Sequence, residues 1–124
     1  MKEAYISYEV AKLLKEKGFD ECIFEFYEGD KIKYARNDEG FRLSELPDTY
    51  YPHITHQMTM AWLREVHNIF IEISVSIDLN SNYHYSYFIL NKECKYVRKG
   101  YTDFDWNYED AVESAIKYCL EKLI

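Results

Sequence analysis

Apolar side chains recur at helical spacing in three segments of the chain, and residues suited to helix ends flank each segment. Ser7 and Asn107 are good N-caps, and Thr55 is placed to start the middle helix. Gly18 and Asn68 suit the left-handed position that follows a helix. The pattern therefore predicts helices over residues 7–18, 56–67 and 107–124.

Alternating apolar and polar positions predict five strands. The alternation in residues 22–27 would place Cys22, Phe24 and Phe26 on one face and Ile23, Glu25 and Tyr27 on the other, and the turn residues that follow predict a hairpin. The clearest strand is 69–77, whose isoleucines and valine share one face while polar residues occupy most of the other. The predicted strands cover residues 22–27, 31–35, 69–77, 83–90 and 94–101.

The predicted order of elements is α-β-β-α-β-β-β-α. Short turns between consecutive strands indicate antiparallel pairing. Together with the amphipathic helices, this order predicts a two-layer α+β fold with a mainly antiparallel sheet and helices on one face. The length of 124 residues suits one domain spanning 1–124. Residues 36–52 form the longest segment expected to be irregular.

The charge balance argues against nucleic-acid binding. The chain carries 22 acidic and 15 basic residues, a net charge of −7, whereas nucleic-acid binding needs Lys and Arg against phosphates. Residues 55–124 follow the α-β-β-β-α order of a double-stranded-RNA-binding domain. The start of the last helix, however, carries Glu109, Asp110 and Glu113 where such domains need basic groups. An acidic nucleic-acid mimic is the least favoured class, because Lys and Glu are interspersed on most predicted helices.

The three cysteines are widely spaced, and no CxxC pair is present. Together with the absence of an apolar signal segment at the start, this predicts reduced thiols in a cytoplasmic protein. No apolar run approaches the length of a membrane span, so no membrane association is expected.

Three of the four histidines lie in residues 50–68 and raise the question of a metal site. His53 and His56 have a spacing that can bracket a metal, and His84 or Asp48 could add a ligand. His67 stands eleven residues, or roughly 16 Å of helix, beyond His56, which is too far for a shared ion. The favoured interpretation is that these histidines flank and terminate a helix. Metal binding is the alternative, and no cofactor or catalytic residue is predicted.

Two other features are candidates for binding a protein partner. Tyr83, Tyr85 and Tyr87 share one face of a predicted strand, which is either a recognition surface or the inner face beside the isoleucines of 69–77. Asp103 and Asp105 flank Phe104 before the last helix and could bind a basic partner. The favoured interpretation of that loop is structural, with an aromatic ring packed under the helix.

Three phrases resemble a family of small uncharacterised proteins from gut bacteria and their phages: YISYEVAKLLKEKGFDE, THQMTMAWLREVHNIFIEI and YEDAVESAIKYCLEKLI. The resemblance implies a stand-alone accessory domain of phage or mobile-element origin, and it supplies no activity, ligand or catalytic residue. The sequence thus predicts a small, acidic, tyrosine-rich, non-enzymatic module that binds a protein partner or itself.

Overall fold

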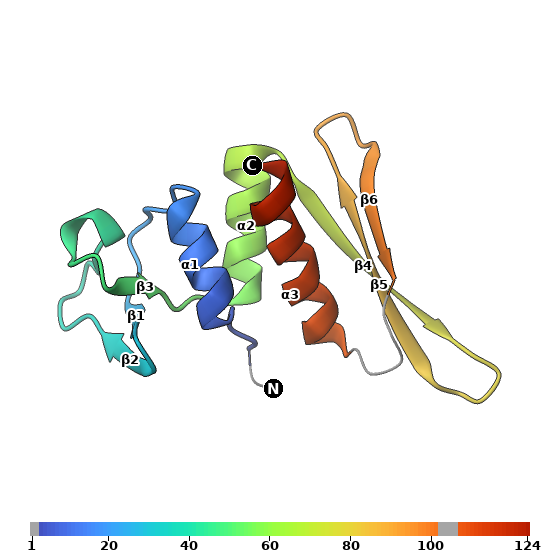
Figure 1. The fold of residues 1–124 in the computed structure, drawn as a ribbon, viewed down its shortest axis with the longest axis horizontal. Coiled ribbons are helices and arrows are strands. Elements are labelled where there is room, and N and C mark those ends of the chain that lie inside the picture. The colour runs from blue at the N-terminus through green and yellow to red at the C-terminus, as the bar shows by residue number, and fades with distance from the viewer. Residues whose placement is uncertain (1–2, 102–106) are drawn as a thin grey trace. The chain divides into compact units, whose positions relative to one another are not determined.

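The computed structural model describes residues 3–101 and 107–124, and the chain divides into two compact units. Unit 1 is Met1–His56 and unit 2 is Gln57–Ile124. Each unit contains a three-stranded antiparallel sheet and at least one helix, as Figure 1 shows. The predicted α+β class and the antiparallel pairing are therefore confirmed.

Unit 1 packs helix α1 against a small sheet of strand order β2-β1-β3. Both neighbours of β1 run antiparallel to it. The elements are α1 (Tyr8–Glu16), β1 (Glu25–Glu28), β2 (Lys31–Tyr34), a 3₁₀ turn (Leu43–Glu45) and β3 (Tyr50–Pro52).

The ends of α1 follow from the sequence. The Ser7 hydroxyl accepts the N–H of Val10 at 3.2 Å, which satisfies one of the free donors at the start of the helix. Gly18 has φ +95°, and the N–H of Phe19 donates to the carbonyl of Leu14 at 3.1 Å. This is a Schellman ending, in which the ring of Phe19 is buried beside the helix. Both predicted helix ends are confirmed.

Two predictions about unit 1 were wrong. The first strand begins at Glu25 rather than Cys22, so Cys22 is exposed and Ile23 is buried instead. An isolated backbone bridge joins Ile23 to Phe41, and it brings the backbone of the preceding residue, Gly40, close to Ile23. Only glycine fits at that position. A Cβ on Gly40 would lie 2.6 Å from the carbonyl oxygen of Ile23.

The second error lies in the 36–52 segment, which was expected to be irregular. Its end forms β3, and Tyr51 pairs with Tyr27 of β1 in the ladder. Pro52 occurs at the last position of this short edge strand, where a missing N–H is tolerated. The predicted order of elements therefore lacked one strand.

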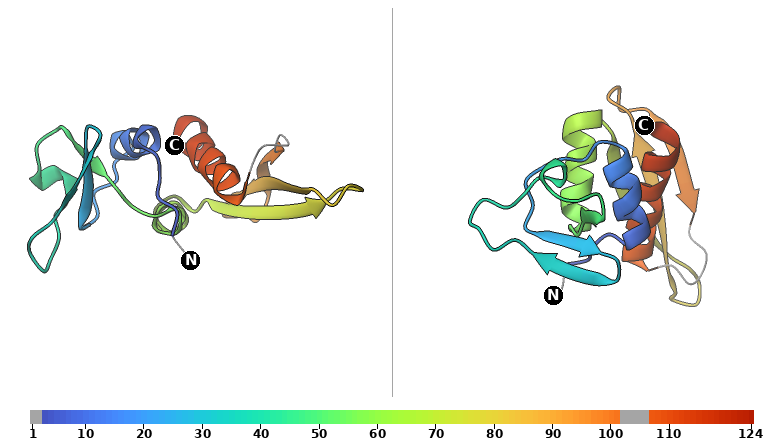
Figure 2. Two further views of the ribbon diagram at one scale, coloured as in Figure 1. Left: turned by 90° about the horizontal axis from the view of Figure 1, so that it is seen from below. Right: turned by 60° about the vertical axis from the view of Figure 1, so that its left-hand side comes forward.

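Unit 2 packs helix α3 on one face of a sheet of order β4-β5-β6 (Figure 2). The predicted β5 matches the observed strand at both ends, and Asn107 caps α3 by accepting the N–H of Asp110 at 2.8 Å. Asn68, with φ 56°, ends α2 as predicted. The elements are α2 (His56–His67), β4 (Phe70–Ile77), β5 (Tyr83–Leu90), β6 (Tyr96–Tyr101), α3 (Tyr108–Tyr118) and a final π turn (Cys119–Leu123).

The core of unit 2 lies between α3 and the sheet. The helix and the π turn that continues it bury small and branched side chains, which allow close approach to the strands: Ala111, Val112, Ala115, Ile116, Cys119 and Leu120. On the sheet, Ile89 and Tyr87 are buried, and the ring of Tyr87 lies over its cross-strand neighbour Gly100. A Cβ at Gly100 would come within 2.1 Å of that ring, so the glycine makes room for the tyrosine.

Candidate functional site

His53 forms a hydrogen-bonded pair with a carboxylate inside an aromatic cluster. Its Nδ1 lies 2.8 Å from Oε2 of Glu25, and its ring stacks on Tyr5 with centroids 4.2 Å apart. The ring of Tyr27 is nearly perpendicular to the same imidazole, with centroids 4.8 Å apart. A carboxylate in this position fixes the orientation of the imidazole, as in many acid–base sites.

No nucleophile accompanies this pair in the part of the chain that the structure describes. The hydroxyl of Tyr27 donates to the carbonyl of Ile6 at 2.7 Å, so it is engaged in holding the chain. The pKa of Tyr5 is raised, chiefly by the negative charge of Glu25, so this phenol stays protonated. The cluster is therefore best understood as packing between the sheet and the N-terminal segment.

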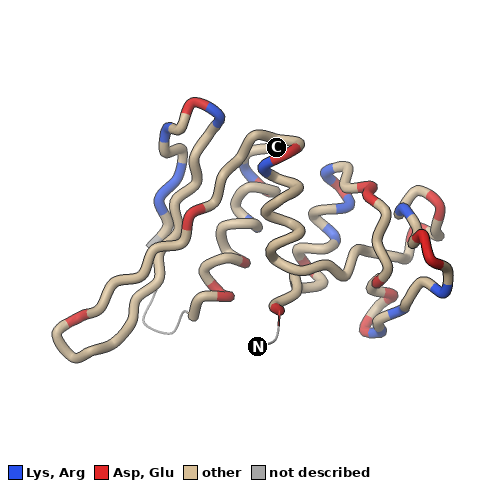
Figure 3. The backbone as a smooth tube through the Cα atoms, turned by 180° about the vertical axis from the view of Figure 1, so that it is seen from behind, with Lys and Arg blue, Asp and Glu red and all other residues tan. Residues whose placement is uncertain are grey.

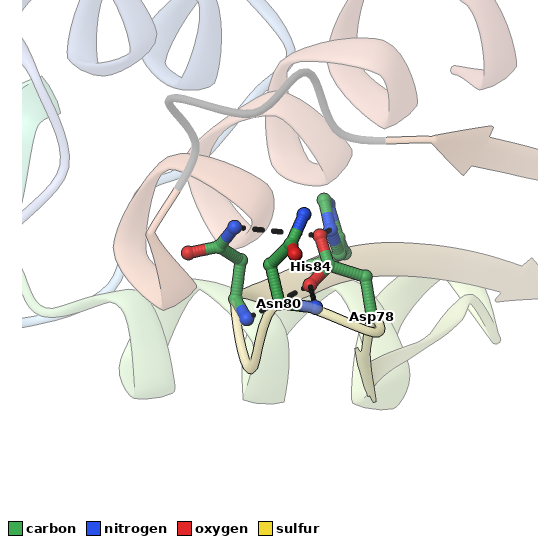
Figure 4. A network of polar contacts seen from close by, with 4 residues as sticks. Asp78, Asn80 and His84 are labelled. Carbon is green, nitrogen blue, oxygen red and sulfur yellow. Dashed lines mark hydrogen bonds and ion pairs between the residues drawn. The ribbon is translucent and has the colours of Figure 1, made fainter.

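His84 belongs to a turn network at the end of the β4–β5 hairpin (Figure 4). Its Nε2 lies 2.8 Å from Oδ2 of Asp78, while Oδ1 of Asp78 accepts the N–H groups of Asn80 at 2.8 Å and Asn82 at 3.0 Å. The hydrogen bond from His84 and then that from Asn82 lower the pKa of Asp78 to about 2. All these contacts stabilise the turn, so the role of His84 there is structural.

The predicted metal ligands are divided between the two units. His53 and His56 belong to unit 1 and His84 to unit 2. His56 is buried at the start of α2, and its backbone N–H donates to the carbonyl of Ala4 at 2.9 Å. The backbone carbonyl of Asp48 accepts a hydrogen bond from Lys15 Nζ at 2.8 Å. Among the described residues, no group of three or more His, Cys, Asp or Glu could hold a metal ion.

The predicted tyrosine stripe lies on the face of the sheet that α3 covers, and its three members differ in depth. Tyr87 is only 4% exposed, and Tyr85 contacts the ring of Tyr108 at the start of α3, with centroids 6.1 Å apart. Tyr83, nearest the hairpin end, is 60% exposed. The inner-face alternative thus describes Tyr87 and Tyr85, and Tyr83 alone offers its ring to a partner.

Asp103 and Asp105 lie outside the described residues. Cys22 and Cys94 are exposed, whereas Cys119, in the π turn that continues α3, is buried, and this burial raises the pKa of its thiol to about 12. Within the described parts of the chain, no helix is long and apolar enough to cross a membrane.

Sequence reasoning missed the free edge of β4. This strand pairs with β5 along its whole length and, among the residues described, with nothing on its other side. The N–H of Asp78 donates to the carbonyl of Asn82 at 3.0 Å, and hydrogen-bonded pairs alternate along an antiparallel ladder. Even-numbered residues of β4 therefore direct their backbone groups toward β5. The backbone groups that point outward belong to Ile71, Ile73, Val75 and Ile77.

The same strand carries apolar side chains that α3 does not reach. The β4–β5 hairpin projects beyond α3 in both figures of the ribbon (Figures 1 and 2). On the helix-covered face of this projection, Val75 is 54% and Ile77 is 61% exposed. Leu79 in the turn is fully exposed, and Tyr83 lies opposite Ile77. An exposed backbone edge thus adjoins an exposed apolar patch, which we call the overhang: Val75, Ile77, Leu79 and Tyr83.

The opposite edge of the sheet has a different character. Strand β6 presents Arg98 and Lys99, and its pairing with β5 shifts register between Ile89 and Leu90. In Figure 3 the positive charges of this sheet lie on its β6 side, whereas β4 carries the single acidic residue Glu72. Charges and bulges are the usual protection of edge strands against pairing. The β6 edge has this protection, and the β4 edge has little of it.

Comparison with known proteins finds no matching family model, no similar curated protein and no similar solved structure.

Proposed function

We propose that this protein is a small, non-enzymatic interaction module of the cytoplasm, and that it binds a protein partner by adding a strand to the free edge of β4. An accessory role in a phage or mobile element, as the sequence resemblance implies, is part of the same proposal. The observation that carries it is the outer side of an eight-residue strand, which pairs with no other described strand and adjoins the exposed overhang.

The backbone of β4 supplies the affinity in this mode of binding. An extended partner segment would accept and donate hydrogen bonds to the outward groups of Ile71, Ile73 and Val75, as in other cases of strand addition. Each such bond contributes only about 0.5–1.5 kcal/mol after exchange with water. A useful affinity therefore requires apolar burial as well.

The overhang supplies that apolar contribution. Val75 and Ile77 are each more than half exposed, although they lie on the face of the sheet that is otherwise the core. Covering them recovers about 25 cal/mol for each Å² of apolar surface removed from water. A partner strand with alternating apolar residues would cover them from the side.

The proposal is tested with a synthetic peptide of residues 69–78 extended by lysines for solubility. At a protein concentration too low for self-association, we expect its addition to slow hydrogen exchange at the amides of Ile71, Ile73, Val75 and Ile77. The even-numbered amides of β4, which already bond to β5, should change little. The odd–even contrast distinguishes strand addition from general stabilisation.

A pair of variants provides the control. Val75→Pro removes an outward N–H without removing a bond to β5, so the fold is retained while binding of the peptide is lost. Val75→Thr keeps the N–H and the branched shape, and it should still bind. Equal binding by both variants, or protection of even and odd amides alike, would contradict the proposal.

A further inference from the structure

We infer that the strand bound by β4 is β4 of a second copy of this chain, running antiparallel, with the two copies related by a twofold axis at Ser74. This inference rests on the proposed function and names the partner for the same edge. The resulting dimer would join the two sheets into one of six strands.

The backbone restricts the pairing to a few registers. Outward groups belong to the odd-numbered residues, so an antiparallel pair of β4 strands must place odd residues opposite odd residues. The same residues face α3, so matching them also keeps the helices of both copies on one face. A shift by a single residue breaks both conditions at once.

Charge and strand length then select one register. A twofold axis at Glu72 would place that carboxylate opposite its own copy, and an axis at Val75 would place it opposite Asp78 of the other copy, so both registers oppose like charges directly. An axis at Ile73 would place Ile77 opposite Ile69, which lies outside β4. Ser74 is the midpoint of the four residues whose backbone groups point outward, so an axis there pairs all four within β4 and places Glu72 opposite Ser76.

The side chains of β4 complement one another in this register. Ile71 lies opposite Ile77 of the second copy, and Ile73 lies opposite Val75. In each pair the more exposed residue of one copy, Ile77 or Val75, lies beside a less exposed residue of the other copy. Because β-branched cross-strand pairs are favourable, the pattern of FIEISVSI complements itself.

The strand pairing also limits the assembly to two copies. A twofold interface uses the same surface on both partners and leaves no β4 edge free. The outer edges of the joined sheet would be the two β6 strands, with Arg98, Lys99 and the register shift described above. The arrangement therefore predicts a closed dimer and no fibre.

The dimer has a distinct dependence on salt. Each copy carries a net charge of −7, so two copies repel each other at low ionic strength. Added salt screens that repulsion, and self-association should strengthen. Binding of a basic partner to this acidic chain would weaken under the same change.

The inference is tested by the mass of the full chain in sedimentation equilibrium and by cysteine crosslinking. We expect a species of twice the 15.0 kDa chain, favoured by salt and lost in Val75→Lys.

Crosslinking uses a background in which the exposed Cys22 and Cys94 are replaced by Ser. There, Ser74→Cys should form a dimer-sized disulfide under mild oxidation. Its two copies face each other in a non-hydrogen-bonded pair, with Cα atoms about 4.5 Å apart.

Ser76→Cys is the matched control on the same strand and face. In the proposed register its two copies are four residues out of step, or roughly 13 Å apart, which a disulfide cannot bridge. Crosslinking of Ser76→Cys as readily as Ser74→Cys would overturn the register.

A chain that stays monomeric up to about 1 mM would overturn the dimer. If such a monomer still binds the β4 peptide, strand addition survives and its partner is another protein. If it binds no peptide, both proposals fail.

Discussion

In unit 1 the tyrosine rings lie between a helix and a sheet, whereas in unit 2 they follow one strand from its buried end to its exposed end. In unit 1, Tyr8 of α1 meets the rings of Tyr27 and Tyr51 edge-on, with centroids 5.5 and 5.3 Å away. Nζ of Lys15 lies 4.8 Å from the ring of Tyr51 and donates to the carbonyl of Tyr50. All three rings are half-buried.

In unit 2 the same residue type occupies three depths on one face. Tyr87 is buried over Gly100, Tyr85 reaches the first residue of α3, and Tyr83 projects beyond the helix. The point at which α3 begins, at Tyr108, decides which ring is covered. Alternation along a strand thus assigns a face to each residue, while the position at which the covering helix begins decides how deeply each part of that face is buried.

The largest expected effect separates the two ends of this stripe. Tyr87→Ala removes a buried ring and leaves a cavity over Gly100, so the free energy of unfolding should fall by about 3–5 kcal/mol. Tyr83→Ala, at the exposed end, should change it by less than about 0.5 kcal/mol. Urea denaturation of both variants, at a concentration too low for association, measures the difference. Similar losses for the two would show that Tyr83 is packed rather than exposed.

A smaller effect is expected from a single hydroxyl in unit 1. The Tyr27 hydroxyl donates to the backbone carbonyl of the buried residue Ile6. Tyr27→Phe removes this donor and leaves the carbonyl without its hydrogen bond. The loss of unfolding free energy should be about 1 kcal/mol. Tyr83→Phe is the matched control in unit 2 and should leave stability unchanged. A neutral Tyr27→Phe would mean that water replaces the hydroxyl at no penalty.

The smallest effect concerns pH at the hairpin end. Because the pKa of Asp78 is lowered to about 2 from 3.8, its contacts favour the folded turn above about pH 4. This contribution is lost as the pH falls from about 4 to about 2, where the carboxylate is protonated in the folded state too. An NMR titration of the Asp78 carboxyl carbon should show a midpoint near 2. In His84→Ala the midpoint should rise toward 3.8, and a wild-type midpoint already near 3.8 would contradict the assignment.

Much of the fold could be predicted because it depends on local patterns. The cap at Ser7, the glycine stop at Gly18 and the cap at Asn107 are signals within a few residues of the helices that they end. The bounds of β5 follow from strict alternation. The short strand β3 could not be found, because Tyr50–Pro52 is too short for a periodic pattern and ends in proline. The exposure of Cys22 depends on the distant bridge between Ile23 and Phe41.

The candidate site was harder to predict than the fold. The pair of Glu25 and His53 joins residues 28 positions apart, and nothing near either one indicates the other. The free edge of β4 has no sequence signal of its own, because an edge is defined by which strands pair. One clue was present: FIEISVSI contains neither proline nor a basic residue, whereas the β6 segment contains both Arg98 and Lys99.

The burial of Cys119 gives the protein a built-in reporter of motion. At pH 8 this thiol, with a pKa of about 12, is almost entirely protonated, and it is buried in the turn that continues α3, whereas Cys22 and Cys94 are open to reagents. Two thiols should therefore react at once and the third only when α3 leaves the sheet. The rate of that slow third reaction therefore measures how often α3 and the turn that follows it open away from the sheet. The measurement requires no substitution in the chain.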